Sequence, residues 1–228
     1  MVRTLKVFVL PCSALLLMAA DSWKAKQIDQ WSEADARQIL AKSPWVQHAT
    51  PGLLPKQSEE AQRQGGKMGG SQGVRAISPA ALFGGPGAKA HAARPSLLKP
   101  LEIRWESARP VRAAEVKIQE EDSPEIQSNT YVIAVYDVPG LDIAMKSLAT
   151  DLQRVAVLSR EGKMDLKPQE VDLLPQANGL TTVVYMFPQS DPITLEDRRV
   201  TFTAVFDHLA VAQYFYLHDM QLAGKLEL

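Results

Sequence analysis

The sequence has no excess of either charge and no hydrophobic run long enough to cross a bilayer. Its 228 residues contain 25 Lys and Arg against 26 Asp and Glu, which gives a formal net charge of −1. Without a strong field of one sign, the chain is not expected to bind nucleic acid or an anionic membrane surface. With 46% hydrophobic and 22% charged residues, the composition is that of a globular protein rather than a disordered polyelectrolyte or a membrane bundle.

Cysteine is also scarce, because Cys12 is the only one in the chain. The sequence around it, Val9-Leu10-Pro11-Cys12, loosely resembles the lipobox of acylated exported proteins. Pro11 stands where that motif needs Gly, Ala or Ser, so lipidation is the minor alternative. If the chain is cleaved beyond this region, the mature protein has no disulfide, no thiolate metal ligand and no cysteine nucleophile. We also expect no bound cofactor.

The first 20 residues have the pattern of a secretory signal peptide. Arg3 and Lys6 form a short basic start, and residues 7–20 follow without a charge. This run is too short for a transmembrane helix, and it ends in small residues just before Asp21. We therefore predict that residues 1–20 are removed during export to the periplasm or the extracellular space, and that the mature chain has no transmembrane span.

Composition divides the rest of the chain into three segments. Residues 21–49 contain three of the four tryptophans, Trp23, Trp31 and Trp45. Residues 50–100 contain nine of the 13 glycines and six of the 15 prolines, without helical or strand periodicity. This composition predicts a flexible, mildly basic linker. Residues 101–228 contain nearly all of the strand-like sequence and are predicted to form the folded body.

A short helix is predicted in the tryptophan-rich segment. Ser32 and Asp35 have the spacing of a capping box, and Ser43-Pro44 ends the helical pattern, which gives a helix over residues 33–42. A helix this short is not stable alone, so its narrow apolar face must be covered. We favour docking on the chain's own β body; the alternative is a tethered motif that binds another protein or an envelope component. The residues predicted to make this interaction are Trp31, Ile39, Leu40 and Trp45.

The body alternates between apolar and polar residues, which indicates β-strands. The predicted strands lie near residues 101–106, 131–136, 155–158, 163–166, 171–174, 182–187, 200–207, 211–218 and 222–228. Helical patterns occupy residues 108–118 and 141–153. Short strands with short connections predict a mainly β fold, with α+β as the alternative. The expected architecture is an antiparallel β-sandwich or a partly open barrel with two or three short helices.

Candidate chemistry is sparse. Asp191, Glu196 and Asp197 would form a paired-carboxylate site only if a cleft brought them together. A histidine site fails on geometry, because His208 at the tip of a hairpin and His218 along its second strand would lie roughly 20 Å apart. The sequence therefore points to no catalytic residue and no metal site.

Several longer motifs resemble those of a known family. They are Trp31-Ser32-Glu33, Ser43-Pro44-Trp45, Arg104-Trp105-Glu106-Ser107-Ala108, Asp191-Pro192-Ile193-Thr194-Leu195-Glu196-Asp197 and the tail Gly224-Lys225-Leu226-Glu227-Leu228. The chain resembles a family of exported bacterial proteins, chiefly acidobacterial hypothetical proteins with no assigned function. The resemblance covers the N-terminal helix and both ends of the body, but not the linker. It implies export and a shared fold, and it adds no active site.

Two hypotheses about function remain. The first is an exported, non-catalytic binding or envelope-associated module of unknown ligand. The second is a hydrolase that acts on envelope or extracellular polymers through carboxylates near residues 191–197. The absence of a nucleophile, a metal set and a cofactor motif favours the first. A concave pocket that gathers two of the carboxylates would favour the second.

Overall fold

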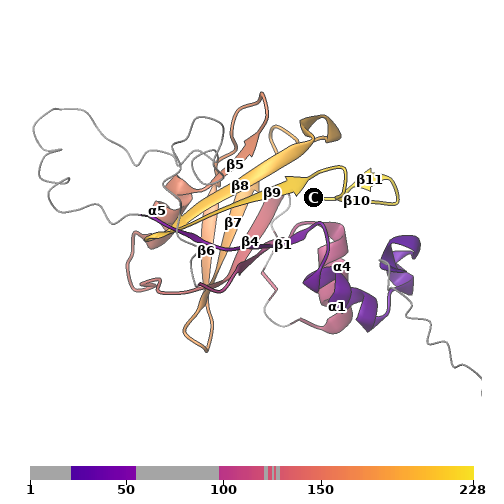
Figure 1. The fold of residues 1–228 in the computed structure, drawn as a ribbon, viewed down its shortest axis with the longest axis horizontal. Helices are drawn as coiled ribbons and strands as arrows, with labels where there is room; N and C mark the ends of the chain where they lie inside the picture. Colours follow the sequence, from indigo (N-terminus) through magenta and orange to yellow (C-terminus); the bar gives the residue numbers. More distant parts are fainter. Residues whose placement is uncertain (1–21, 55–97, 121–122, 125, 127–128) are drawn as a thin grey trace, which may run out of the picture.

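The computed structural model describes residues 22–54, 98–120, 123–124, 126 and 129–228, and within these the fold is mainly antiparallel β. Two sheets pack face to face, and three short α-helices lie at the ends of the sandwich (Figure 1). The predicted fold class is therefore confirmed. The predicted signal peptide and most of the predicted linker, residues 55–97, lie outside the described residues.

The first sheet has five strands in the order β1-β3-β4-β7-β6. Their bounds are β1 Val46–Ala49, β3 Leu101–Trp105, β4 Thr130–Val138, β7 Thr181–Pro188 and β6 Glu170–Pro175. As the alternation predicts, Leu101, Ile103 and Trp105 lie in the core of the sandwich. Because successive side chains of a strand point to opposite faces, Glu102 and Arg104 lie on the outer face of the same sheet.

The second sheet has four strands in the order β2-β9-β8-β5. Their bounds are β2 Gly52–Leu53, β9 Leu209–Tyr216, β8 Arg199–Phe206 and β5 Val157–Arg160. Strands β8 and β9 form a hairpin that turns at Asp207, whose φ of +52° is in the left-handed region that Asp tolerates. The strand expected at residues 163–166 is reduced to a single bridge between Leu158 and Leu166.

Two of the three α-helices lie close to their predicted positions. Helix α1 (Glu33–Ala41) begins with the predicted capping box: Ser32 Oγ accepts from the Asp35 amide at 3.2 Å, and an Asp35 carboxylate oxygen accepts from the Ser32 amide at 2.9 Å. Helix α4 (Arg109–Ile118) has Pro at its N-terminus, where the missing N–H costs no hydrogen bond. It packs against α1.

The third helix begins later than predicted. Helix α5 spans Leu148–Val155, whereas the pattern predicted a start near residue 141. Asp142 explains the difference, because its carboxylate accepts from the amide of Ala144 at 3.2 Å. This local turn competes with the first turn of a helix.

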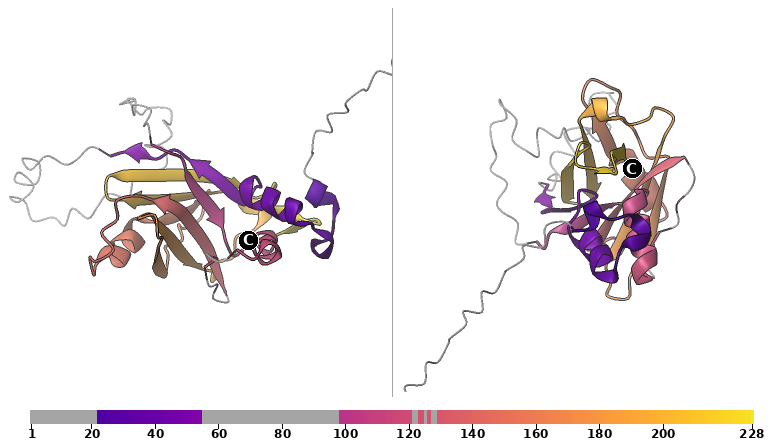
Figure 2. Two further views of the ribbon diagram at one scale, coloured as in Figure 1. Left: turned by 90° about the horizontal axis from the view of Figure 1, so that it is seen from below. Right: turned by 90° about the vertical axis from the view of Figure 1, so that its right-hand side faces the viewer.

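The N-terminal segment is part of the sandwich rather than a separate unit. Strand β1 pairs with β3 in the first sheet, and β2 pairs with β9 in the second, so the chain crosses from one sheet to the other between Ala49 and Gly52. Figure 2 shows this segment running along the sandwich. The segment boundaries inferred from composition are corrected accordingly: the expected linker begins with a strand, and the folded body does not start at residue 101.

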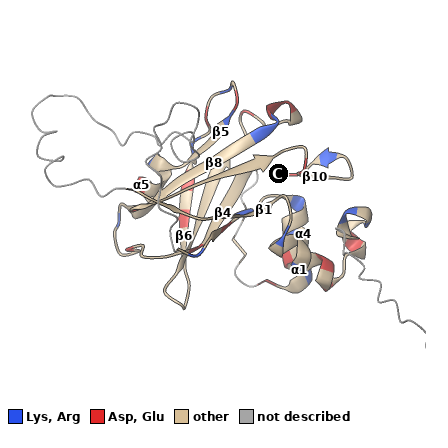
Figure 3. Ribbon diagram, in the orientation of Figure 1, with Lys and Arg blue, Asp and Glu red and all other residues tan. Residues whose placement is uncertain are grey.

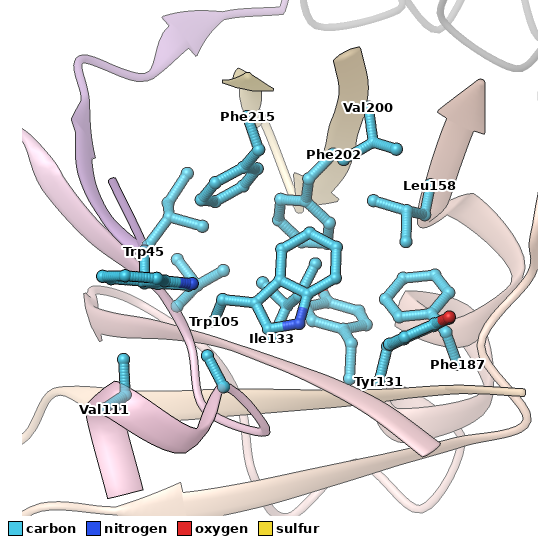
Figure 4. Close-up of a cluster of buried hydrophobic side chains, with 14 of the residues drawn as sticks. Trp45, Trp105, Val111, Tyr131, Ile133, Leu158, Phe187, Val200, Phe202 and Phe215 are labelled. Atoms are coloured by element: carbon cyan, nitrogen blue, oxygen red, sulfur yellow. The ribbon is translucent and has the colours of Figure 1, made fainter. Parts of the chain in front are cut away.

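Aromatic side chains from both sheets and from the N-terminal segment fill the core (Figure 4). The ring centroid of Trp105 lies 5.3 Å from that of Phe215 and 5.9 Å from that of Tyr131, both at edge-to-face angles. Trp23 contacts Trp31 and Trp45 at 6.2 and 5.8 Å. Such pairs stabilise a core beyond the area they bury. All four tryptophans therefore belong to one continuous core.

The C-terminal residues form a small hairpin rather than a strand of either large sheet. Strands β10 (Gln221–Leu222) and β11 (Lys225–Leu226) pair across a turn in which Ala223 and Gly224 both have positive φ. The expected strand over residues 222–228 is thus interrupted, because two left-handed residues make a tight hairpin turn. The indole Nε1 of Trp45, the residue before β1, donates to the Glu227 carbonyl at 2.7 Å and connects this tail to the N-terminal segment.

Candidate functional site

The residues predicted to bind a partner are all buried inside the chain's own fold. They are Trp31, Ile39, Leu40 and Trp45. Their helix is covered by the chain itself, as the favoured hypothesis expected, but mainly by α4 rather than by a sheet. The proposed interaction residues are corrected on this ground: a side chain buried in the core is not available to another protein in this fold.

The three carboxylates of the hydrolase hypothesis are held separately. Asp191 forms a 2.5 Å ion pair with Arg160, whose hydrogen bond holds the pKa of Asp191 below its ordinary value. Asp197 is buried, accepts from the amide of Thr194 at 2.8 Å and lies 2.7 Å from Lys163 Nζ. Two of the carboxylates are therefore neutralised by different cations.

Glu196 borders an open cavity of about 620 Å³ next to the C-terminal residues. We call this cavity the tail pocket. It is lined by Tyr131, Gln189, Ile193, Thr194, Leu195, Glu196, Leu226 and Leu228. Its volume is in the range of small-molecule sites, and half of its lining side chains are apolar. Of the three carboxylates, only Glu196 contributes to it.

Tyr131 fixes one wall of the tail pocket. Its hydroxyl accepts a hydrogen bond from the amide of Ile193 at 2.9 Å, which holds the loop before the 3₁₀ helix Leu195–Asp197 against β4. Burial raises the pKa of Tyr131, so this hydroxyl is protonated at neutral pH. The loop is held from its other side by Arg160, which donates to the Asp191 carbonyl at 3.3 Å. The pocket is thus preformed by bonds within the chain.

A second cluster of charged side chains lies on the outer face of β3, against α4. The Arg104 guanidinium donates to Glu102 at 2.6 Å, to Glu120 at 3.2 Å and to Glu115 at 3.4 Å, and it lies over the ring of Tyr136. Charged residues gather on α1 and α4 in the same part of the molecule (Figure 3). Arg112 adds a 2.6 Å bond to Glu115.

Glu106 lies at the bottom of this cluster and is fully buried. One of its oxygens accepts from the hydroxyl of Tyr136 at 2.6 Å. Burial, followed by the neighbouring Glu115 carboxylate, raises the pKa of Glu106 well above its ordinary value. A second carboxyl group close by disfavours the charged form of a buried carboxyl group, which is the direction of this pKa change. Since both side chains are almost without solvent exposure, the pair is out of reach of a dissolved substrate.

Sequence reasoning did not find the Glu106–Glu115 pair. The alternation through β3 places Glu102, Arg104 and the following residue, Glu106, on one face, and this pattern could have indicated a charged cluster there. The partner on α4 could not be inferred, because the crossing of a helix over a strand is set by packing between distant residues.

In the part of the chain that the structure describes, the histidines form no comparable cluster. His208 lies at the β8–β9 turn, where its Nδ1 is 2.7 Å from the carboxylate of Asp207. Across the described ranges of the chain, no group of three or more His, Cys, Asp or Glu side chains is placed to hold a metal ion.

Comparisons of the chain with protein-family models, with curated proteins and with solved structures gave no significant match. Among the helices of the described segments, none has both the length and the hydropathy needed to span a membrane.

Proposed function

We propose that this chain is an exported, non-catalytic binding module and that the tail pocket binds a small, largely apolar ligand. Export rests on the signal-peptide pattern of residues 1–20 and is compatible with association with the cell envelope. The observation that carries the binding proposal is a preformed pocket lined by partly exposed leucines. Leu195 is 44% exposed, and Leu226 and Leu228 are partly buried beside it.

Apolar side chains in a fixed concave surface favour a ligand that removes them from water. Burying a leucine side chain is worth about 1.5–3 kcal/mol. Gln189, Thr194 and Glu196 supply polar groups at the rim of the same pocket. A few polar groups around an apolar lining orient a ligand and are typical of small-molecule sites.

The hydrolase hypothesis has weaker support from the same loop. Hydrolysis by paired carboxylates needs two acidic groups that face the same substrate. Asp191 and Asp197 instead form ion pairs with Arg160 and Lys163, which leaves Glu196 as the single acid of the tail pocket. A lone carboxylate can bind a hydrogen-bond donor, and binding is the function that this geometry favours.

The test uses Nile red, a neutral apolar dye, as the probe in a fluorescence titration of the full chain. We expect saturable binding that Leu195→Ser weakens about tenfold, because the variant loses the contact of one leucine. The control is Met164→Ser, which changes a side chain that is 85% exposed and is not part of the pocket lining. Absence of saturable binding, or equal effects of the Leu195 and Met164 variants, would overturn the proposal.

A further inference from the structure

A second cavity lies where α1 ends and β1 begins, beside the end of β9. Its volume is about 470 Å³, and we call it the corner pocket. The side chains that matter for its chemistry are Lys24, Lys42, Gln47, His48, Tyr216 and Asp219. It shares no lining residue with the tail pocket, so it is an independent site.

The charge of the corner pocket is positive although the whole chain is nearly neutral. The charged residues of its lining, histidine aside, are Lys24, Lys42 and Asp219. His48 is exposed beside them, and its Nε2 lies 3.6 Å from the carboxylate of Glu102. An ammonium group is a mobile point charge that binds carboxylate or phosphate oxygens. The pocket therefore favours an anionic ligand.

An aromatic surface borders the same pocket. Tyr216 lies on the outer face of the second sheet and is 54% exposed. Its ring centroid is 6.5 Å from that of Tyr214, and the Arg199 guanidinium lies 4.5 Å over the Tyr214 ring. A large exposed aromatic ring gives apolar contact area at little cost in side-chain entropy, and its hydroxyl can hydrogen-bond at the edge. This combination suits a sugar ring, which has an apolar face of C–H groups and hydroxyl groups around its edge.

Hydrogen bonds and a buried side chain hold the backbone that presents these groups. The Lys42 amide donates to the Gln38 carbonyl at 2.8 Å and closes the last turn of α1. Gln47 Nε2 donates to the Pro44 carbonyl at 3.2 Å, and the buried Trp45 anchors the turn between them. Since the backbone is already ordered, little conformational entropy is lost when a ligand binds.

We propose that the corner pocket binds an acidic saccharide, with Tyr216 against the face of a sugar ring and Lys42 on its carboxylate. Lys24 and His48 line the same pocket. A protein exported to the cell envelope meets such polymers, but the inference rests on the pocket itself. It stays valid if the tail pocket proves not to bind a ligand.

The experiment is a titration of the full, ¹⁵N-labelled chain with three probes: trigalacturonate, the neutral maltotriose and inorganic phosphate. We expect trigalacturonate to bind, to shift the amide signals of residues 42–48 and 216–219, and to bind more weakly at higher salt. Maltotriose should bind at least about tenfold more weakly, because it lacks the charge-assisted bond. Phosphate should also bind more weakly, because it lacks the sugar ring.

Two variants and one control assign the site. Lys42→Gln and Tyr216→Ala should each weaken trigalacturonate binding about tenfold. Lys117→Gln, a matched loss of charge on the exposed face of α4, should not. The proposal is overturned if trigalacturonate does not bind, if maltotriose or phosphate binds equally well, or if Lys42→Gln and Lys117→Gln have the same effect.

Discussion

At the scale of single residues, Glu106 links stability to pH. Its folded-state pKa is raised above the ordinary value of 4.5, so between these two values the folded chain holds a proton that the unfolded chain has released. The folded state then binds more protons than the unfolded state, and stability falls as pH rises through this window. Asp191 has the opposite sign, since its pKa is lowered, but its exposed position makes its effect small.

Glu106→Gln should remove this loss of stability at higher pH. The amide can keep both neighbours, accepting from Tyr136 and donating to Glu115, without a proton to lose. We expect the difference in melting temperature, variant minus wild type, to be larger at pH 8 than at pH 5. The gain is about 1.4 kcal/mol, or roughly 3 °C, for each unit by which the pKa of Glu106 is raised.

Thermal melts at both pH values check this expectation. Glu161→Gln, at the exposed turn after β5, is the matched control and should not reproduce the increase. A Glu106→Gln variant that loses the same stability at pH 5 and pH 8 would show that the carboxyl group does not titrate with unfolding.

At the scale of elements, the C-terminal hairpin is a structural part of the core. The Glu227 carbonyl accepts from Trp45 Nε1, and the Glu227 amide donates to the Met220 carbonyl at 3.1 Å. Leu226 and Leu228 pack partly buried against the main cluster. The alternation of leucines with charges in the sequence predicted that the tail pairs as a strand. It did not predict the partners of the tail, because β10 and the buried Trp45 indole come next to it only when the chain folds.

Deleting residues 226–228 should lower the melting temperature by about 5–10 °C. Two half-buried leucines and the two hydrogen bonds of Glu227 are worth roughly 3–4 kcal/mol, which corresponds to such a shift in a domain of this size. Trp45→Phe, which removes the indole donor together with part of a fully buried ring system, should also lower the melting temperature. Differential scanning calorimetry measures both, and a truncated chain that melts like its parent would contradict the structural role of the tail.

At the scale of the whole molecule, the two parts of the chain on either side of residues 55–97 form one fold. Strand β1 pairs with β3, β2 pairs with β9, and the tryptophans of the N-terminal segment are buried in the common core. The N-terminal segment therefore buries more side chains in the core than a single helix docked on the surface would bury. The association of the two parts therefore does not depend on an intact connection between them.

Limited proteolysis should cut within residues 55–97, which composition predicts to be a linker, and leave both fragments associated. The nicked protein should elute as a single species from a size-exclusion column in native buffer and separate into two fragments in urea. Mass spectrometry identifies the cut sites. Release of the N-terminal fragment without denaturant would mean that β1, β2 and the buried tryptophans do not hold the two parts together.

The sequence by itself determined the local features of this protein. Strand alternation, the capping box of Ser32 and Asp35, and the β8–β9 hairpin all follow from interactions among residues close in the chain. Only the tertiary structure decided which surfaces these elements cover. The Trp45–Glu227 bond joins residues 182 positions apart, and the Glu106–Glu115 pair and both pockets exist only where separate elements cross. Such contacts arise from packing of the whole core, which leaves no periodic signal along the chain.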